Sequence, residues 1–182
     1  MFSKQGFTLL ELIIALMILT ITITLGVPSL VSSVVNSRLT SQANDLVLSL
    51  NSARSESIKR SKLVAVMRTN AQWRDGWQVY VDDNGNQVFD QNEVIVQASG
   101  SINGSYTLLP DNAFADQIIY RPDGRSNARG QFVLCAPSGV ADFRLINIQD
   151  TGRIQSQTPE QYCRQDPLPL GCPNDAYANV CP

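Results

Sequence analysis

The chain opens with an apolar segment that is long enough to form one helix across a bilayer. Between Phe7 and Leu30 the sole ionisable side chain is Glu11. At about 1.5 Å per residue, this length matches a hydrocarbon core roughly 30 Å thick, so a membrane-spanning helix is predicted. Gly26 and Pro28 fall late in the segment. Because proline lacks a backbone donor, we expect the helix to kink or melt locally there.

Helical spacing continues beyond the apolar segment, now with one apolar face. Five residues recur at alternating steps of four and three: Leu39, Ala43, Leu46, Leu50 and Ala53. Such a stripe is typical of a helix that packs on a core. Basic residues close the pattern at Arg60, which suits a helix C-terminus. One long helix is therefore predicted over 7–61, with its first half in a membrane and its second half under a head.

From residue 62 to 157 the period of the pattern falls to two, as in strands that bury one face. Turn sequences such as DDNGN and PDGR separate the segments. Eight strands are predicted: Leu63–Thr69, Gly76–Asp82, Glu93–Ala98, Tyr106–Leu109, Gln117–Arg121, Gln131–Ala136, Asp142–Gln149 and Arg153–Ser156. The predicted fold class is α+β, a long helix packed on an antiparallel β-rich head.

The segment 158–182 is rich in proline, has little periodicity and is predicted to be a tail held by disulfides. The chain has four cysteines: Cys135, Cys163, Cys172 and Cys181. An even number after a membrane-targeted start favours disulfides in an oxidising compartment, and three connectivities are open. Because Cys135 lies in a predicted strand and Cys163 is the first tail cysteine able to reach it, we expect Cys135–Cys163 and Cys172–Cys181.

Glu11 is the residue of the apolar segment that costs free energy when the segment enters a membrane. A carboxylate in hydrocarbon costs several kcal/mol unless it is paired or hydrated, so it is a functional candidate. The segment offers no cation. Cleavage between Gly6 and Phe7 would create an α-amine one helical turn away, in the same chain or in a neighbour. We therefore predict that Glu11 aligns subunits in an assembly.

The residues KQGFTLLELIIALMI resemble the signal of type IV prepilins. The resemblance implies that a prepilin peptidase removes the leader 1–6 after Gly6 and methylates the Phe7 amine. Glu11 and Pro28 match that family's glutamate and helix-breaking proline. Over about the first 60 residues the chain resembles FimT/FimU-type minor pilins and the related GspH pseudopilins. The implied fold is the type IV pilin fold.

The resemblance implies a structural subunit at or near the tip of a type IV pilus, which supports the initiation of filament assembly. Its partners would be other minor pilins, the major pilin, the peptidase and the inner-membrane assembly machinery. Lys4 precedes the apolar segment, so the positive-inside rule places the head in the periplasm, before transfer to the cell surface. Two alternatives stay open: a DNA-binding minor pilin for natural transformation, and a minor pseudopilin of type II secretion.

Composition argues against an enzyme. The chain has no histidine, which removes Ser-His and Cys-His nucleophilic sites, and no spacing supports another catalytic pair. A net charge of −2 argues against bulk electrostatic binding of nucleic acid. We expect no resident cofactor, with Ca²⁺ as the one candidate ligand.

The Ca²⁺ candidate is the sequence DDNGNQVFDQNE. Five side chains fall at positions 1, 3, 5, 9 and 12 of an EF-hand-like loop: Asp82, Asn84, Asn86, Asp90 and Glu93. Gln87 stands at position 6, where EF-hands have glycine, and strands flank the loop. A polar hairpin turn explains the same residues.

Four arginines lie in or beside predicted turns and are candidates for DNA phosphate contacts: Arg121, Arg125, Arg129 and Arg153. DNA-binding FimT-type pilins carry a basic G-R-x-R motif. Here Gly152 and Arg153 match it, but Gln155 replaces the second arginine. Solvated turn charge is the alternative. Trp73 and Trp77 are predicted to be core residues and not a binding surface.

Overall fold

The computed structural model describes residues 8–102, 104–137, 142–158 and 181. The chain forms two compact units, Met1–Ser37 and Arg38–Pro182. One helix, α1 (Leu9–Arg60), contributes its first part to the first unit and its second part to the second.

The helix α1 begins and ends with favourable end residues. The Thr8 hydroxyl accepts a hydrogen bond from the Glu11 backbone N–H at 3.3 Å, which caps the first turn. Lys59 and Arg60 occupy the last turn, where cations interact well with the helix dipole.

The predicted local melting at Gly26 and Pro28 is wrong, because α1 is helical over all 52 of its residues. The other possibility, a kink, stays a prediction. A proline inside a helix costs about 3 kcal/mol. Ending one helix and starting another would instead leave up to about eight backbone groups without helical partners, in a stretch that is mostly apolar. A helix that continues through Pro28 therefore costs less free energy than an interrupted helix.

In the second unit, α1 buries the predicted stripe. Its five apolar residues are each at most 1% exposed: Leu39, Ala43, Leu46, Leu50 and Ala53. Two buried serines extend the same face with satisfied hydroxyls. Ser49 donates to the carbonyl of Asp45 at 2.9 Å, and Ser57 donates to the carbonyl of Arg54 at 2.8 Å. The helix thus supplies one wall of the head's core.

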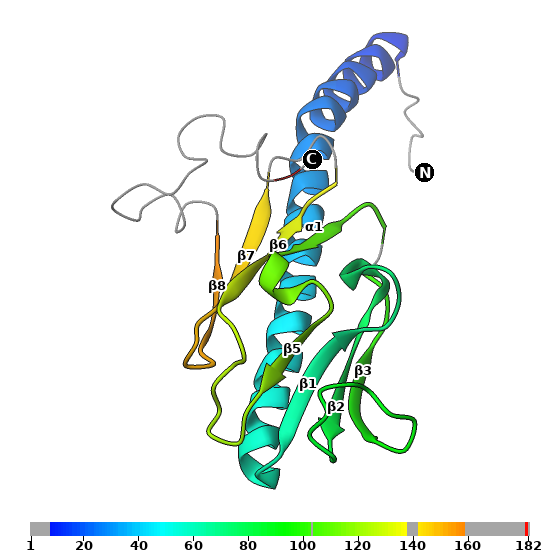
Figure 1. Ribbon diagram of the computed structural model, residues 1–182. Helices are drawn as coiled ribbons and strands as arrows, with labels where there is room; N and C mark the ends of the chain where they lie inside the picture. The colour runs from blue at the N-terminus through cyan, green and yellow to red at the C-terminus, as the bar shows by residue number, and fades with distance from the viewer. Residues whose placement is uncertain (1–7, 103, 138–141, 159–180, 182) are drawn as a thin grey trace, which may run out of the picture. The chain divides into compact units, whose positions relative to one another are not determined.

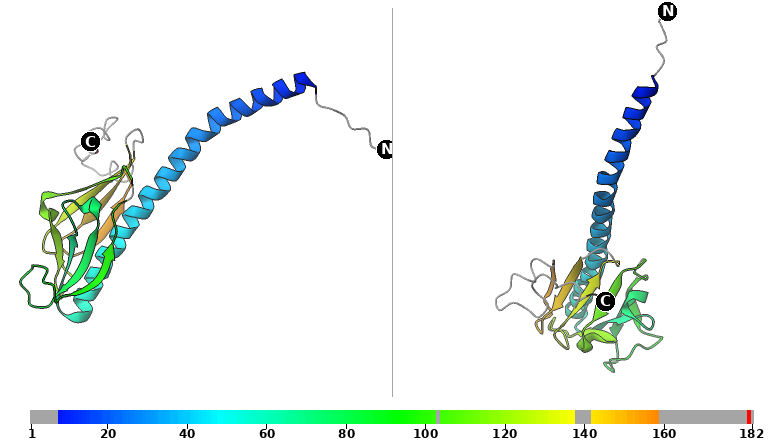
Figure 2. Two further views of the ribbon diagram at one scale, coloured as in Figure 1. Left: turned by 90° about the vertical axis from the view of Figure 1, so that its right-hand side faces the viewer. Right: turned by 90° about the horizontal axis from the view of Figure 1, so that it is seen from above.

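Two four-stranded antiparallel sheets lie on the same side of the second part of α1 (Figures 1 and 2). The first has the order β3-β2-β1-β5 and consists of β1 (Leu63–Arg68), β2 (Trp77–Asp82), β3 (Val94–Ser99) and β5 (Gln117–Tyr120). The second has the order β4-β6-β7-β8 and consists of β4 (Thr107–Pro110), β6 (Gly130–Cys135), β7 (Phe143–Ile148) and β8 (Ile154–Gln157). The α+β prediction is confirmed.

Aromatic side chains join the two sheets. Trp73, in the short helix η1 (Trp73–Asp75), meets Phe132 of β6 edge-on with ring centroids 4.9 Å apart. Phe114, in the short helix η2 (Asn112–Phe114), stacks on the same Phe132 at 5.6 Å. The Trp73 indole N–H donates to the carbonyl of Phe114 at 2.8 Å. Trp73 and Trp77 are 1% and 2% exposed, so both are core residues as predicted.

The disulfide prediction is wrong. Cys135, at the end of β6, is bonded to Cys181, which excludes both Cys135–Cys163 and Cys172–Cys181. Sequence order was a poor guide because the entropy of closing a loop grows only logarithmically with its length, so a distant cysteine competes well with a near one. Cys163 and Cys172 lie outside the described residues.

Candidate assembly and binding sites

The first part of α1 exposes apolar side chains on every side. Eleven of them are between 42% and 77% exposed: Leu9, Leu10, Leu12, Ile13, Ile14, Leu16, Met17, Ile18, Leu19, Ile21 and Ile23. Consecutive residues on a helix point about 100° apart, so this set covers the whole circumference. A helix that is apolar all round belongs in lipid or among other apolar helices.

The threonine hydroxyls of this segment are satisfied within the helix itself. The hydroxyls of Thr20 and Thr22 donate to carbonyls one turn back, each at 2.8 Å. Thr24 does the same, to Thr20 at 2.8 Å and to Ile21 at 3.0 Å. The helix surface therefore presents methyl and methylene groups even at its threonines. Across the residues whose helices and side chains are described, no helix combines the length and the hydropathy needed to cross a membrane.

Glu11 lies in the first turn of this helix, and Thr8 lies at its N-cap. The spacing is that of a capping box, T-x-x-E, of which the bond from the Glu11 N–H to the Thr8 hydroxyl is present. Sequence reasoning missed Thr8, although the T-x-x-E spacing signalled it. None of the ion pairs among the described residues involves Glu11. Gly6 and Phe7 lie outside the described residues, so the Phe7–Glu11 pairing stays a prediction.

The candidate Ca²⁺ loop is closed by its own hydrogen bonds. Asp82, 2% exposed, accepts the backbone N–H groups of Gly85 at 2.6 Å and Gln87 at 2.9 Å. Glu93, 8% exposed, accepts those of Asp83 at 3.1 Å and Asp90 at 3.0 Å. These two carboxylates thus act as the loop's internal acceptors, which is the role expected in a hairpin turn.

The remaining candidate ligands meet at Asp90, whose carboxylate accepts the side-chain amides of Asn84 at 2.7 Å and Asn86 at 3.0 Å. Gln87 has φ of 63°, the left-handed conformation that suits the sharp turn glycine makes at position 6 of EF-hands. Within the described parts of the chain, no group of three or more Asp, Glu, Cys or His side chains has a metal-binding arrangement. Calcium binding stays a prediction.

Three of the four candidate DNA-binding arginines, Arg121, Arg125 and Arg153, lie in or beside two turns that touch. A Cβ placed on Gly152 would lie 2.0 Å from the Gly124 carbonyl oxygen, and both glycines have positive φ, 75° and 77°. Arg54 of α1 fastens the pair: its Nε donates to the Gly124 carbonyl at 2.9 Å and its Nη2 to the Thr151 carbonyl at 3.2 Å. Sequence reasoning missed Arg54, and no local signal marks it.

This junction brings Arg121 and Arg125, in the turn after β5, next to Arg153, in the turn between β7 and β8. All three side chains are exposed, and so is Arg129. Arg125 shares its turn with Asp123, whose carboxylate lies 4.0 Å from Arg125 Nε. The structure therefore brings the turns of three of the four predicted cations together but places an acid among them.

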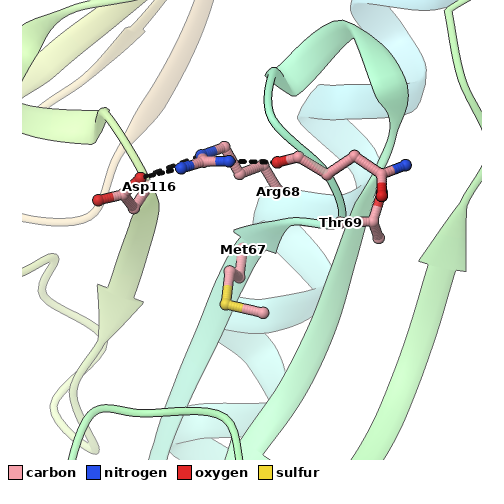
Figure 3. A pocket seen from close by; sticks show the side chains of 5 residues that line it. Met67, Arg68, Thr69 and Asp116 are labelled. Atoms are coloured by element: carbon pink, nitrogen blue, oxygen red, sulfur yellow. Dashed lines mark hydrogen bonds and ion pairs between the residues drawn. The ribbon is translucent and has the colours of Figure 1, made fainter.

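A separate surface pocket of about 380 Å³ lies at the end of β1, lined by Met67, Arg68, Thr69, Asn70 and Asp116. Figure 3 shows that Arg68 spans it. Its Nε and Nη2 donate to Asp116 Oδ1 at 3.0 and 2.5 Å, and its Nη1 donates to the Asn70 carbonyl. Because these contacts occupy the guanidinium of Arg68, we interpret them as structural contacts that link β1 to β5.

An all-round apolar helix whose second part completes the core of a two-sheet head is the architecture of pilin-like proteins. Residues 42–152 match the family of the type II transport protein GspH, and residues 1–27 match the prokaryotic N-terminal methylation motif. The chain belongs to the GspH family of type IV pilin-like proteins. Members of such families interact with other pilins and with assembly machinery. No curated protein matches the chain.

The fold resembles that of the type IV minor pilin FimU from Pseudomonas aeruginosa. Two crystal structures of FimU align with TM-scores of 0.56 and 0.54 at 18% identity. They cover 69% and 68% of this chain and 96% and 98% of the FimU chains. The predicted type IV pilin fold is confirmed.

Proposed function

We propose that the protein is a minor pilin, a structural subunit at or near the tip of a type IV pilus that supports the initiation of filament assembly. The observation that carries this proposal is the first part of α1, apolar on every side and interrupted by one carboxylate, Glu11. The N-terminal methylation motif and the FimU-like fold support it. Processing would occur between Gly6 and Phe7, at the inner membrane, with the head in the periplasm.

The apolar surface of the first part of α1 favours the transfer of this segment out of water. Fully burying an exposed leucine or isoleucine contributes about 1.5–3 kcal/mol, and the eleven apolar side chains from Leu9 to Ile23 are on average about half exposed. Covering them is therefore worth on the order of 10 kcal/mol. Lipid and neighbouring helices offer nearly the same apolar environment, so this term does not by itself choose the filament over the membrane.

We propose that Glu11 makes the filament more favourable than the membrane. A carboxylate surrounded by packed apolar helices is tolerable only when a cation neutralises it, and in this proposal the α-amine of Phe7 in the same or a neighbouring subunit is that cation. When the amine comes from a neighbouring subunit, only one register along the filament axis pairs every glutamate. The cost of desolvating Glu11 thereby becomes an alignment signal.

The test is Glu11→Gln in the full chain, with incorporation into sheared pili measured by immunoblot against the membrane fraction. We expect normal membrane retention and a loss of at least about tenfold in incorporation, since 1.4 kcal/mol of lost pairing already gives tenfold. Glu56→Gln is the matched control: it lies on the same helix but pairs with Lys59 and Arg60 near the surface. Equal incorporation of both variants would remove the alignment role.

Deleting the gene separates the pilus from the secretion pseudopilus of the GspH kind. Loss of surface pili with normal secretion supports the minor pilin, and loss of secreted enzymes with normal pili supports the pseudopilin.

A second candidate function is DNA capture, favoured by the contact between the Gly124 and Gly152 turns that groups Arg125 and Arg153. Electrophoretic shift of duplex DNA by the full chain in detergent tests it. The double variant Arg125→Gln/Arg153→Gln should weaken binding and flatten its salt dependence, because each lost phosphate contact lowers the slope by about one. Arg38→Gln, an exposed arginine outside the two turns, is the control. Absence of any shift at low salt would exclude this function.

A further inference from the structure

Strand β3 forms a free edge of the first sheet. It is the outer strand of the order β3-β2-β1-β5, and Figure 1 shows no strand of the described chain beyond it. Within the described residues, no backbone hydrogen bond joins β3 to a segment on its outer side. An edge strand presents a row of unpaired N–H and C=O groups, which is a template for pairing with another extended chain.

The other edge strands are shorter, and two of them are protected. β4, β5 and β8 have four residues each, whereas β3 has six. On the outer side of β5, the Asn127 N–H donates to the Ile119 carbonyl at 2.8 Å, and the Ile119 N–H donates to Asn127 Oδ1 at 2.9 Å. β4 ends in Pro110, a residue that blocks strand addition. β3 has neither a charge nor a proline, and its Val94 and Ile95 are 48% and 47% exposed.

The hydrogen-bond pattern identifies which backbone groups of β3 face outward. The Thr69 N–H donates to the Gly76 carbonyl at 3.0 Å, so the hydrogen-bonded pairs between β1 and β2 fall on the even-numbered residues of β2. Gln78 is one of these residues, and it lies opposite Ala98 of β3. Because Gln78 directs its N–H and C=O toward β1, those of Ala98 point away from β2, into the free side of the edge.

A bulge limits the length of this edge. Val96 has no partner in β2, because the register shifts between Ile95 and Gln97. Bulges twist an edge strand and shorten the run that a second strand can follow. We therefore expect an added strand to pair over residues 97–99. So short a pairing is weak by itself, but it is sufficient for a partner that is already held nearby, because tethering raises the effective concentration.

The helix α1 lies beside the same edge and adds a pocket to it. Gln97 Nε2 donates to Ser49 Oγ of α1 at 3.0 Å, and the neighbouring Leu48 is 63% exposed. Where β3 ends, Asp45 of α1 and residues 99–102 contribute to the lining of a pocket of about 180 Å³. A strand edge that leads into a side-chain pocket is the arrangement used in β-strand addition, where the edge gives affinity and the pocket gives specificity.

We propose that residues 97–99 pair with an extended segment of a partner pilin, and that a lysine or arginine of this segment enters the pocket beside Asp45. Asp45 is exposed, and none of the described residues that line the pocket carries a positive charge, so a cationic side chain is favoured there. β3 itself is uncharged, so the paired part of the segment is expected to be uncharged as well. The choice of a pilin as the partner rests on the proposed filament function, but the free edge does not.

Ala98→Pro tests the pairing, because it removes an outward N–H without removing a bond to β2. Incorporation into sheared pili, relative to the membrane fraction, should fall at least about threefold, as expected for one lost hydrogen bond. The melting temperature of the full chain in detergent should stay within about 4 °C of the unmodified value. Ala98→Lys, which keeps the N–H but places a charge on the edge, should lower incorporation in the same way.

Ser156→Pro is the matched control, because Ser156 is an exposed residue of the edge strand β8. The Gln149 N–H donates to the Arg153 carbonyl, which puts the hydrogen-bonded pairs of this hairpin on odd-numbered residues, so the Ser156 N–H also points outward. Normal incorporation of Ala98→Pro and Ala98→Lys, or an equal loss in Ser156→Pro, overturns the proposal. A larger fall in the melting temperature of Ala98→Pro would show that its N–H belongs to the sheet and would also overturn it.

Asp45→Lys tests the pocket. Reversing the charge should lower incorporation about tenfold or more, since a cationic side chain would then meet a like charge. Asp111→Lys makes the same change at an exposed aspartate whose side chain caps no helix, and it should have little effect. An equal loss in both variants overturns the cationic partner.

A photoreactive benzoyl-phenylalanine in place of Ala98, in cells that assemble pili, identifies the segment. We expect a link to another pilin, mapped by mass spectrometry to an uncharged run beside a lysine or arginine. A link only between two β3 strands, or no link to any pilin in the membrane fraction or in pili, overturns the proposal. If the unmodified protein is absent from pili while the link to another pilin forms in the membrane fraction, the filament function fails and the strand pairing stands.

Discussion

Opening the disulfide between Cys135 and Cys181 should destabilise the head by several kcal/mol. The bond closes a loop with a sequence separation of 46. In the chain-entropy model, a loop of that length restricts the unfolded state by about 4 kcal/mol at 25 °C. For a chain of this size, each kcal/mol shifts the melting temperature by about 2–4 °C, so Cys181→Ser should melt about 8–16 °C lower. Circular dichroism in detergent, without reductant, measures the change.

Cys135→Ser is the matched partner variant, because it breaks the same bond from the β6 side. Each single variant and the double variant should melt at about the same temperature, since the second change has no bond left to remove. Cys163→Ser should not lower the melting temperature in the same way, because Cys163 is not part of this bond.

Peptide mapping without reduction gives the direct answer. An endoproteinase that cleaves before aspartate places each cysteine on its own peptide: 123–141, 150–165, 166–174 and 175–182. We expect a linked species that joins 123–141 to 175–182. A linked 123–141 with 150–165 would instead restore the Cys135–Cys163 pairing and refute the structure's connectivity.

Four further predictions concern the head. Tyr120→Phe should be neutral or stabilise by about 1 kcal/mol, because its buried hydroxyl has no partner among the described residues; Tyr80→Phe should destabilise by about 1 kcal/mol, because it loses the 3.1 Å bond to Gln117. Burial, and then the charges of nearby carboxylates, raise the pKa of Tyr80 to about 12. Unfolded tyrosine ionises near pH 10, so the contribution of Tyr80 to denaturant-measured stability should be fully present below pH 10, and about 2–3 kcal/mol of it should be lost up to pH 12. Tyr80→Phe should remove this part of the fall, and a further part should remain because burial raises the pKa of Tyr120 as well. Arg54→Met should destabilise by about 2 kcal/mol in the same assay, since it leaves two turn carbonyls without their charged donor.

The strands could be predicted because their signal is local. Alternating burial follows directly from alternating sequence, and all eight predicted strands lie within one residue of the observed ones at each end. The α1 stripe was equally accessible, because a period of 3.6 residues fixes which side chains share a face. Leu39 and Ala53, at its two ends, are both fully buried.

The unpredicted features depend on contacts between distant residues. Arg54 reaches carbonyls 70 and 97 residues away, and nothing near Arg54 in sequence marks those partners. Cys135 likewise pairs with Cys181 across 46 residues. The unpaired indole N–H of Trp77 was missed for the same reason: the tryptophan was correctly placed in the core, but whether its N–H finds a partner is visible only once its surroundings are known.

The position of α1 in the chain sets the order in which the head can be completed during synthesis. The helix is made first, but Thr40 receives a hydrogen bond from Arg144 of β7, 104 residues later. Non-local contacts form only when the intervening chain exists, so the stripe from Leu39 to Ala53 remains uncovered while most of the polypeptide emerges. An uncovered apolar face is prone to aggregation. The newly made chain must therefore be kept from self-association until β7 appears, and oxidation can lock the head only after residue 181 has followed.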